Sequence, residues 1–410
     1  MKKDIDRLMH DNDLTALLVI GPADHNPFMY YFTGGHHISN SDLVKPVGKK
    51  PVLFHSPMER DEAAATGLKT IGYDRYKFME LFEQVKGDQI KAHTWLYKKI
   101  FTEMGLIKGR VMLYGKADAG WVHEITKSLR KALPGFEFVG DTKNVVLPTA
   151  MMTKDAEELD RIRHMGDITT RVVARTAEFL TSHRAKNGRL IKRNGKPLTI
   201  GEVKSNINLW LAEAGVENPE GTIFAIGRDA GIPHTTGNPT DELSLGKTIV
   251  FDIYPCESLG GYFYDFTRTW CLGYAPDDVQ RLYDDVKHVY DTMVSELKVN
   301  TSGAGYQHRT CMLFAARGHP TIEQDRQTIN GYNHSLGHGI GLNVHEKPFL
   351  SAVSQDKIVK GSVFTIEPGL YYPEKGMGVR IEDSYYVTPE GRIECLAPYS
   401  FDLVLKVKGH

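Results

Sequence analysis

The sequence contains few cysteines and no long uncharged apolar run. Its four cysteines lie far apart and form no Cys-x-x-Cys pair: Cys256, Cys271, Cys311 and Cys395. This pattern argues against a structural zinc site and predicts reduced thiols in a cytoplasm. No uncharged stretch reaches the roughly 20 apolar residues that span a bilayer. Charged residues follow Lys2 and Lys3 where an export signal would have an apolar segment, so we expect a cytoplasmic protein.

An excess of charge of one sign is also absent. The chain has 50 Lys and Arg against 51 Asp and Glu, a formal net charge of -1. This balance gives no electrostatic reason to expect a nucleic acid or an anionic membrane as partner. The local exception is the basic segment 182–197, which contains Asn187-Gly188 and Asn194-Gly195 as turn signals. We interpret it as an exposed insertion hairpin, with an anion-binding patch as the alternative.

The length of 410 residues exceeds what one hydrophobic core usually serves, so two domains are predicted, 1–150 and 151–410. The first resembles a small α/β unit. It has short apolar runs suited to buried strands at Leu17–Ile20, Val52–Phe54 and Val111–Tyr114. A helix with one buried face is predicted around Trp121, Ile125 and Leu129. His36-His37 is interpreted as a solvated loop pair.

The second domain has the order helix, helix, strand pair, twice over, which predicts an α+β fold with an internal duplication. Its helices are expected near Thr153, from the capping-box spacing Thr199-x-x-Glu202, after Pro276 and over Tyr306–Arg317. The two strand pairs are expected at Thr248–Tyr254 with Tyr262–Leu272, and at Val363–Tyr372 with Val379–Thr388.

Each predicted strand pair carries two carboxylates that are expected to bind a cation. Asp252 lies within the apolar run Ile249–Tyr254, where an ionised carboxylate is costly unless it is paired or bound to metal. Asp265 follows at an odd separation of thirteen, so the two can lie directly opposite in an antiparallel hairpin. Glu367 and Glu382 are also separated by an odd number of residues, fifteen, so they too can lie opposite each other. Two like charges that face each other repel unless a cation lies between them.

Histidines complete this constellation. His338 stands among glycines that let backbone approach closely, and we expect it to be the nitrogen ligand. Four carboxylates and one imidazole suit two divalent ions, Mn²⁺ first, with Co²⁺ or Zn²⁺ as alternatives. Three further histidines are candidates for binding the reacting groups, each with packing as the alternative: His234, His334 and His345. Arg380 shares the strand face of Glu382, and Asp383 points the other way.

The segments around these residues resemble the pita-bread metallopeptidases, which include prolidases, aminopeptidases P and methionine aminopeptidases, with creatinases as relatives. The matching segments include Asp265-Phe266-Thr267-Arg268-Thr269, Gly337-His338-Gly339-Ile340-Gly341-Leu342 and Ile366-Glu367-Pro368-Gly369. The resemblance implies a pseudo-two-fold pita-bread catalytic domain. Residues 1–150 resemble, more weakly, the creatinase-type domain that precedes it in prolidases and aminopeptidases P.

The resemblance also implies roles for the residues. It identifies five metal ligands: Asp252, Asp265, His338, Glu367 and Glu382. Asp265 and Glu382 would bridge both ions, and Glu367 would also take the proton of the attacking water. His345 and His234 would serve the reacting groups as catalytic residues. The residues implied in substrate binding are His334, Arg380 and Tyr371.

The implied activity is hydrolysis of the Xaa-Pro bond, at the N-terminus of a peptide or in a dipeptide, and the implied assembly is a homodimer. The alternatives are a metal-independent creatinase-like amidinohydrolase and a non-catalytic binding module on the same fold. The sequence departs from the family in the spacing of its aspartates, since the family usually has eleven, with glycine where Tyr254 stands. We expect the metal site to survive and the tip of the hairpin to project further.

Overall fold

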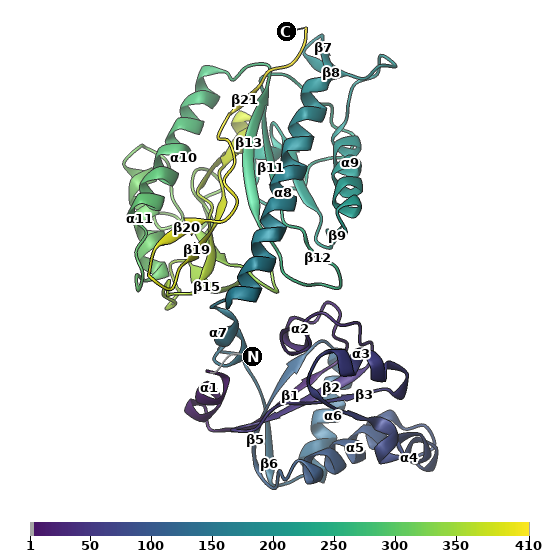
Figure 1. Cartoon of the computed structure of the whole chain (residues 1–410). Coiled ribbons are helices and arrows are strands. Elements are labelled where there is room, and N and C mark those ends of the chain that lie inside the picture. The colour runs from purple at the N-terminus through teal and green to yellow at the C-terminus, as the bar shows by residue number, and fades with distance from the viewer. Residues whose placement is uncertain (1–3, 410) are drawn as a thin grey trace. The chain divides into compact units, whose positions relative to one another are not determined.

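The computed structural model describes residues 4–409 of the chain (Figure 1). They form two compact units, described separately below. The first is Met1–Met151 with Leu259–Gly261, and the second is Met152–Ser258 with Tyr262–His410. The residues at the tip of the first predicted hairpin thus group with the first unit. Among residues 4–409, no helix is both long and apolar enough to cross a membrane.

The first unit is built on a six-stranded sheet of order β4-β3-β2-β1-β5-β6. The strands are β1 (Leu14–Ile20), β2 (Ser41–Pro46), β3 (Val52–His55), β4 (Lys69–Gly72), β5 (Gly109–Gly115) and β6 (Phe136–Gly140). The helices are α1 (Ile5–Asp11), α2 (Pro27–Thr33), α3 (Arg60–Ala65), α4 (Phe78–Gln84), α5 (Gln89–Glu103), α6 (Ala119–Ala132) and α7 (Leu147–Met151). β1 is parallel to β5 and antiparallel to β2.

The strands and the helix that the apolar patterns predict in this unit are present. All three expected strands are present, as parts of β1, β3 and β5. Ile125 and Leu129 on α6 are buried in the core and Trp121 packs against it, which confirms the predicted helix face. His36 and His37 lie outside helices and strands, and His37 is an exposed partner of Asp24.

The second unit pairs its helices as the duplication predicts: α8 contacts α9, and α10 contacts α11. Their bounds are α8 (Ala156–Ser182), α9 (Ile200–Glu213), α10 (Asp277–Glu296) and α11 (Gly303–Ala315). In Figure 1 the two pairs lie on either side of the strands of this unit. The capping box at the start of α9 is formed in both directions by Thr199 and Glu202, as its spacing predicts.

Two sheets form the centre of this unit. One has the order β10-β11-β13-β21 and the other β15-β14-β16-β19-β20. The strands are β10 (Thr222–Ile226), β11 (Thr248–Ile253), β13 (Phe266–Leu272), β21 (Val404–Leu405), β14 (Gly337–Gly339), β15 (Glu346–Leu350), β16 (Val363–Ile366), β19 (Asp383–Val387) and β20 (Ile393–Cys395). Shorter pairs are β7 (Arg184–Lys186) with β8 (Arg189–Ile191), β9 (Val216–Glu217) with β12 (Cys256–Glu257), and β17 (Gly369–Tyr372) with β18 (Met377–Arg380).

The basic segment 182–197 forms the predicted hairpin, β7 and β8. Its turn is Asn187-Gly188, with φ of 52° and 73°, the left-handed values that such a pair favours. Two of its basic residues have acidic partners, since Arg189 pairs with Glu242 and Lys192 with Glu202. These pairs favour the insertion hairpin over an anion-binding patch.

The register of the first carboxylate hairpin corrects the prediction. The expected strand Tyr262–Leu272 begins only at Phe266, so Asp265 precedes β13. Asp252 lies opposite Thr267 and not opposite Asp265. The odd separation still places both carboxylates on the same face of the hairpin. Asp265 lies two residues along its chain from Thr267, the residue that is opposite Asp252.

The second carboxylate hairpin agrees with the prediction more closely. Ile366 pairs with Asp383 in one ladder, and Gly369 pairs with Arg380 in the next. Both ladders have the same register, and this register places Glu367 opposite Glu382. The ladder is interrupted at this point, and the backbone of Glu382 bridges to Thr267 of the other sheet instead. This bridge joins the two halves of the duplication where the carboxylates lie.

Candidate active site

A cavity of about 400 Å³ lies between the two carboxylate hairpins of the second unit. Nine of the ten residues predicted for the site line it: Asp252, Asp265, His338, Glu367, Glu382, His234, His334, His345 and Arg380. The tenth, Tyr371, lies behind this lining and donates or accepts hydrogen bonds with two of its members, His334 and Arg380. The structure thus brings the predicted residues together around one space.

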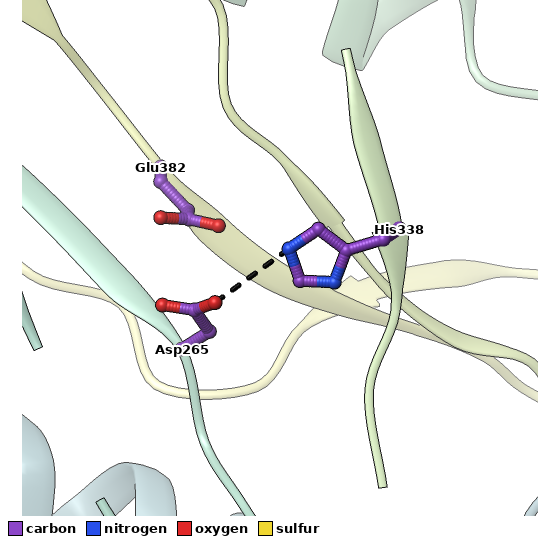
Figure 2. Close-up of side chains that lie close together, drawn as sticks. All are labelled: Asp265, His338 and Glu382. Carbon is purple, nitrogen blue, oxygen red and sulfur yellow. Dashed lines mark ion pairs between the residues drawn. The ribbon is translucent and has the colours of Figure 1, made fainter. Parts of the chain in front are cut away.

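Asp265, His338 and Glu382 form the tightest group in the cavity (Figure 2). One donor atom of each lies within 4.8 Å of the others, close enough to share a metal ion. His338 Nε2 is 3.6 Å from Asp265 Oδ2. The backbone fixes the ring, because His338 N donates to Thr365 Oγ1 and Nδ1 lies 3.1 Å from the carbonyl of Gly339. Nε2 is therefore the nitrogen that faces the carboxylates.

Glu367 and Asp252 extend this group. Glu367 Oε1 lies 3.4 Å from His338 Nε2. Asp252 Oδ2 accepts a hydrogen bond of 2.7 Å from Arg380 Nη2. Glu382 is held from the first hairpin, because its Oε2 accepts from Thr267 Oγ1 at 2.8 Å. Both sheets thus contribute to the placement of the same carboxylates.

Three acids of this group, Asp265, Glu367 and Glu382, have pKa values raised above their ordinary values. Burial raises the pKa of Asp265 well above its usual value, and the charges of Glu382 and Asp252 raise it further. Burial and the charge of Glu367 raise the pKa of Glu382 likewise. Burial also raises the pKa of Glu367 to about 8, although Arg380 opposes the shift. Burial is the largest cause in all three, and the charges of neighbouring acids add to it.

These residues fit divalent cations. Three buried carboxylate oxygens have no hydrogen-bond partner, Asp252 Oδ1, Asp265 Oδ1 and Glu382 Oε1, although buried polar atoms are normally paired. Burial lowers the pKa of His338 to about 3, with a further contribution from His345, so at neutral pH the imidazole is in the neutral form that ligates metals. Cations would both satisfy the oxygens and relieve the repulsion.

A second chain of contacts runs along one side of the cavity. His334 Nε2 is 2.9 Å from the Tyr371 hydroxyl, which accepts a hydrogen bond of 2.8 Å from Arg380 Nη1. Burial lowers the pKa of His334 to about 3, with Arg380 adding to the shift, so His334 is neutral at pH 7. Burial raises the pKa of Tyr371 to about 12 against the opposing effect of Arg380. Arg380 is therefore the one side chain of this group that carries a full positive charge.

Asp383 and Arg268 support the site from behind. Asp383 points away from the cavity, as the alternation predicts, and accepts from Arg268 Nη2 at 2.9 Å and from the Tyr290 hydroxyl. Arg268 Nη1 also donates to the carbonyls of Thr267 and Glu382. This buried pair ties together the two backbone segments that carry the bridging contact.

Some residues that line the cavity are not predictable from the sequence. Glu220, Ser335 and Phe349 are among them. Glu220 belongs to the stretch Asn218-Pro219-Glu220-Gly221, which is typical of an ordinary turn. Tyr254, which stands where the family usually has glycine, lines the cavity too.

The chain belongs to metallopeptidase family M24, whose sequence pattern matches residues 160–389, more than half of its length. The class of protein is therefore a metal-dependent peptidase, a hydrolase. Among known proteins the chain is similar to a putative dipeptidase, YkvY, of Bacillus subtilis, with 29% identity over 70% of this chain and 82% of the relative. It is also 25% identical to a Xaa-Pro dipeptidase of Pyrococcus horikoshii over 95% of this chain and 94% of the relative.

Solved structures share the fold along the whole chain. A prolidase from Pyrococcus horikoshii OT3 superimposes with a TM-score of 0.73 at 22% identity, covering 98% of this chain and 99% of the other. An X-Pro aminopeptidase from Thermotoga maritima gives a TM-score of 0.73 at 21% identity, covering 98% and 100%. The fold is thus the pita-bread fold preceded by an α/β unit, as the sequence predicts.

Proposed function

We propose that this chain is a dinuclear-metal peptidase that hydrolyses the Xaa-Pro bond, in dipeptides or at the N-terminus of peptides. The observation that carries the proposal is the buried group of Asp265, His338 and Glu382, whose donor atoms lie within 4.8 Å of one another. Asp252 and Glu367 complete a set of five ligands around the same cavity. The division of the chain into a creatinase-like domain, 1–150, and a catalytic domain, 151–410, is part of this proposal.

Two divalent ions bound there, Mn²⁺ by the oxygen-rich set of ligands, would lower the pKa of a water molecule and polarise the scissile carbonyl. Asp265 and Glu382 are the proposed bridging ligands. Each has one oxygen without a hydrogen-bond partner, Asp265 Oδ1 and Glu382 Oε1, which would be available to hold an ion. Co²⁺ and Zn²⁺ are the alternatives for the same set of donors.

The protein side chains supply the remaining steps. Glu367, whose Oε1 lies 3.4 Å from His338 Nε2, would accept the proton of the attacking water and return it. His345 and His234 line the cavity and hydrogen-bond the scissile group and the departing proline nitrogen. His345 is T-stacked at 4.2 Å on the ring of His338, which fixes it beside the proposed metal ligands.

The binding of the proline side rests on the contact chain described above. His334 borders the proline ring, Tyr371 lies close to the reacting water, and Arg380 holds the downstream end of the substrate. Arg380 suits this task because it is charged and its guanidinium is fixed by Asp252 and Tyr371. The substrate partner is thus a proline-containing peptide, and by analogy with relatives the chain assembles as a homodimer.

The dipeptidase form of the activity is favoured by the names of two relatives that the chain covers well, the putative dipeptidase and the Xaa-Pro dipeptidase. The test compares hydrolysis of Met-Pro and Met-Pro-Ala by metal-stripped protein, with and without added Mn²⁺. We expect Mn²⁺-dependent cleavage of Met-Pro. Cleavage of Met-Pro-Ala alone would make the enzyme an aminopeptidase P. An enzyme that binds Mn²⁺ and cuts neither peptide would overturn the Xaa-Pro specificity.

A further inference from the structure

One charged residue of the cavity has no role in the scheme above. Glu220 lines the same cavity as the proposed ligands, yet its side chain is exposed at the surface. The other four carboxylates of the cavity have neighbours there. Asp265, Glu382 and Glu367 lie around His338, and Asp252 pairs with Arg380. Among the described residues Glu220 takes part in no ion pair or side-chain hydrogen bond, so its charge is available to a ligand.

The backbone holds Glu220 at a fixed place. It lies in the turn before β10, where Gly221 N donates to the carbonyl of Asn218 at 3.2 Å. The side chain of Asn218 closes the turn by donating to Thr222 Oγ1 at 3.0 Å. Gly221 takes a φ of +80°, a value that glycine adopts without strain. Glu220 therefore stands on a turn that is closed by backbone and side-chain hydrogen bonds.

Strand pairing brings this turn to the end of β11 that carries a ligand. Thr222 pairs with Ile253 and Ile223 with Asp252, so the residues just before Thr222 lie beside Tyr254. Tyr254 and His345 line the same cavity as Glu220. The carboxylate of Glu220 therefore borders the space around the proposed ligands and catalytic residues.

Once the other charges of the cavity are paired, the negative charge of Glu220 remains available to bind a cation. The four inward carboxylates would be balanced by two divalent ions, and Arg380 already pairs with Asp252. Every unblocked Xaa-Pro peptide carries an α-ammonium group, and it carries a second cation when Xaa is Lys or Arg. Since Arg380 is the proposed partner of the downstream end, a carboxylate on the cavity wall suits the opposite, positively charged end.

We infer that Glu220 is a specificity-determining residue that binds a positively charged group on the Xaa residue of the substrate. The inference rests on the proposed Xaa-Pro activity. The cation is either the α-ammonium group or the side-chain cation of Lys or Arg, which share the same ion-pair chemistry. In both cases Glu220 acts on substrate binding, so its removal raises KM and leaves kcat nearly unchanged.

The experiment measures kcat and KM of the Mn²⁺-loaded full chain and of Glu220→Gln for Lys-Pro and Met-Pro. It also measures the inhibition constant of N-formyl-Met-Pro as a competitor, because this ligand lacks the α-ammonium group. Glu157→Gln is the matched control, since Glu157 is an exposed glutamate on α8 that does not line the cavity. Glu220→Lys reverses the charge at the same position.

If the side chain of Xaa is recognised, the preference for Lys-Pro over Met-Pro falls about three- to tenfold in Glu220→Gln, the size of a partly exposed ion pair or charged hydrogen bond. Glu220→Lys would then favour Glu-Pro. If the α-ammonium group is recognised, the preference for Met-Pro over its formylated form falls by a similar factor. The control changes neither ratio.

Unchanged ratios in an active Glu220→Gln enzyme overturn the inference and leave the proposed function standing. A wild-type enzyme that binds Mn²⁺ but cuts neither these dipeptides nor Met-Pro-Ala overturns the proposed function itself, and the two failures are therefore distinguishable. A loss of kcat at constant KM in Glu220→Gln also contradicts the inference, because it would place Glu220 in the chemical step and not in substrate binding.

Discussion

The two units of the molecule each bury carboxylates, and they treat these groups differently. In the first unit, Asp42 is 6% exposed and both of its oxygens accept hydrogen bonds of 2.7 Å, from the hydroxyls of Tyr73 and Tyr97. In the second unit, Asp265 and Glu382 are 4% and 1% exposed. Each of these two keeps one oxygen without a partner.

This difference separates a structural acid from a site. Burial raises the pKa of Asp42, although its two tyrosine hydrogen bonds oppose the shift. Both oxygens of this acid have partners within the protein. Asp265 and Glu382 repel one another and each has one oxygen without a partner, an arrangement that costs folding free energy unless something else binds. Burial alone therefore does not identify a functional carboxylate, whereas a cluster of buried acids that repel one another and lack partners indicates a site.

The largest expected effect is on activity, in the second unit. Asp265→Asn removes a proposed bridging ligand, so we expect kcat/KM for Met-Pro to fall more than about 100-fold, because changes to groups that merely support a ligand already cost about 10–100-fold. Without metal, the raised pKa of Asp265 costs stability at neutral pH. Asparagine cannot ionise, so the metal-free variant should unfold at a higher temperature than the metal-free wild type. Calorimetric melting and kinetics of both proteins check the pair of outcomes.

Asp167→Asn, at an exposed position on α8, is the control for Asp265→Asn. It should leave both the kinetics and the melting temperature close to those of the wild type. A fully active Asp265→Asn enzyme would contradict the proposed ligand role.

The opposite pattern is expected in the first unit. Asp42→Ala leaves the buried hydroxyls of Tyr73 and Tyr97 without their acceptor, so the free energy of unfolding should fall by about 2 kcal/mol. The Mn²⁺-dependent kcat should stay unchanged, because Asp42 does not line the cavity. Denaturant unfolding followed by circular dichroism measures the stability. An Asp42→Ala protein as stable as the wild type would show that the two hydrogen bonds contribute nothing net.

The smallest expected effect is a pH dependence. The pKa of Asp42 is raised in the folded protein by burial, so its contribution to stability is present below the unfolded value near 3.9 and is lost as the pH rises through the folded pKa. Asp42→Asn keeps one acceptor and one donor for the two phenols and cannot ionise. Its stability relative to the wild type should therefore increase from about pH 4 upward. A difference that stays constant over this range would contradict the raised pKa.

Local rules predicted much of this fold. The capping box of Thr199 and Glu202, the turn Asn187-Gly188 and the buried face of α6 depend on residues close in sequence, and all three are present. Strand alternation also placed Asp383 on the face opposite the cavity, where Arg268 and Tyr290 bind it.

Long-range pairing was less predictable. The alternation of a strand fixes the face on which Asp252 and Asp265 point but not the register, and the structure shifts Asp265 off the position opposite Asp252. The two-residue strand β21 (Val404–Leu405) pairs with β13 from far along the chain, and its sequence is too short to carry a periodic signal. Glu220 reaches the cavity only because β10 pairs with β11, a contact that a turn sequence does not encode.

The measurement that tests the central claim most directly is a calorimetric titration of the metal-stripped full chain with Mn²⁺, followed by hydrolysis of Met-Pro on the same samples. We predict two Mn²⁺ ions bound per chain, activity that rises with their occupancy, and loss of at least one binding event in Asp265→Asn. A wild-type chain that binds no Mn²⁺, Co²⁺ or Zn²⁺, or that hydrolyses Met-Pro equally well without metal, would contradict the proposal that the buried carboxylates hold a dinuclear metal centre.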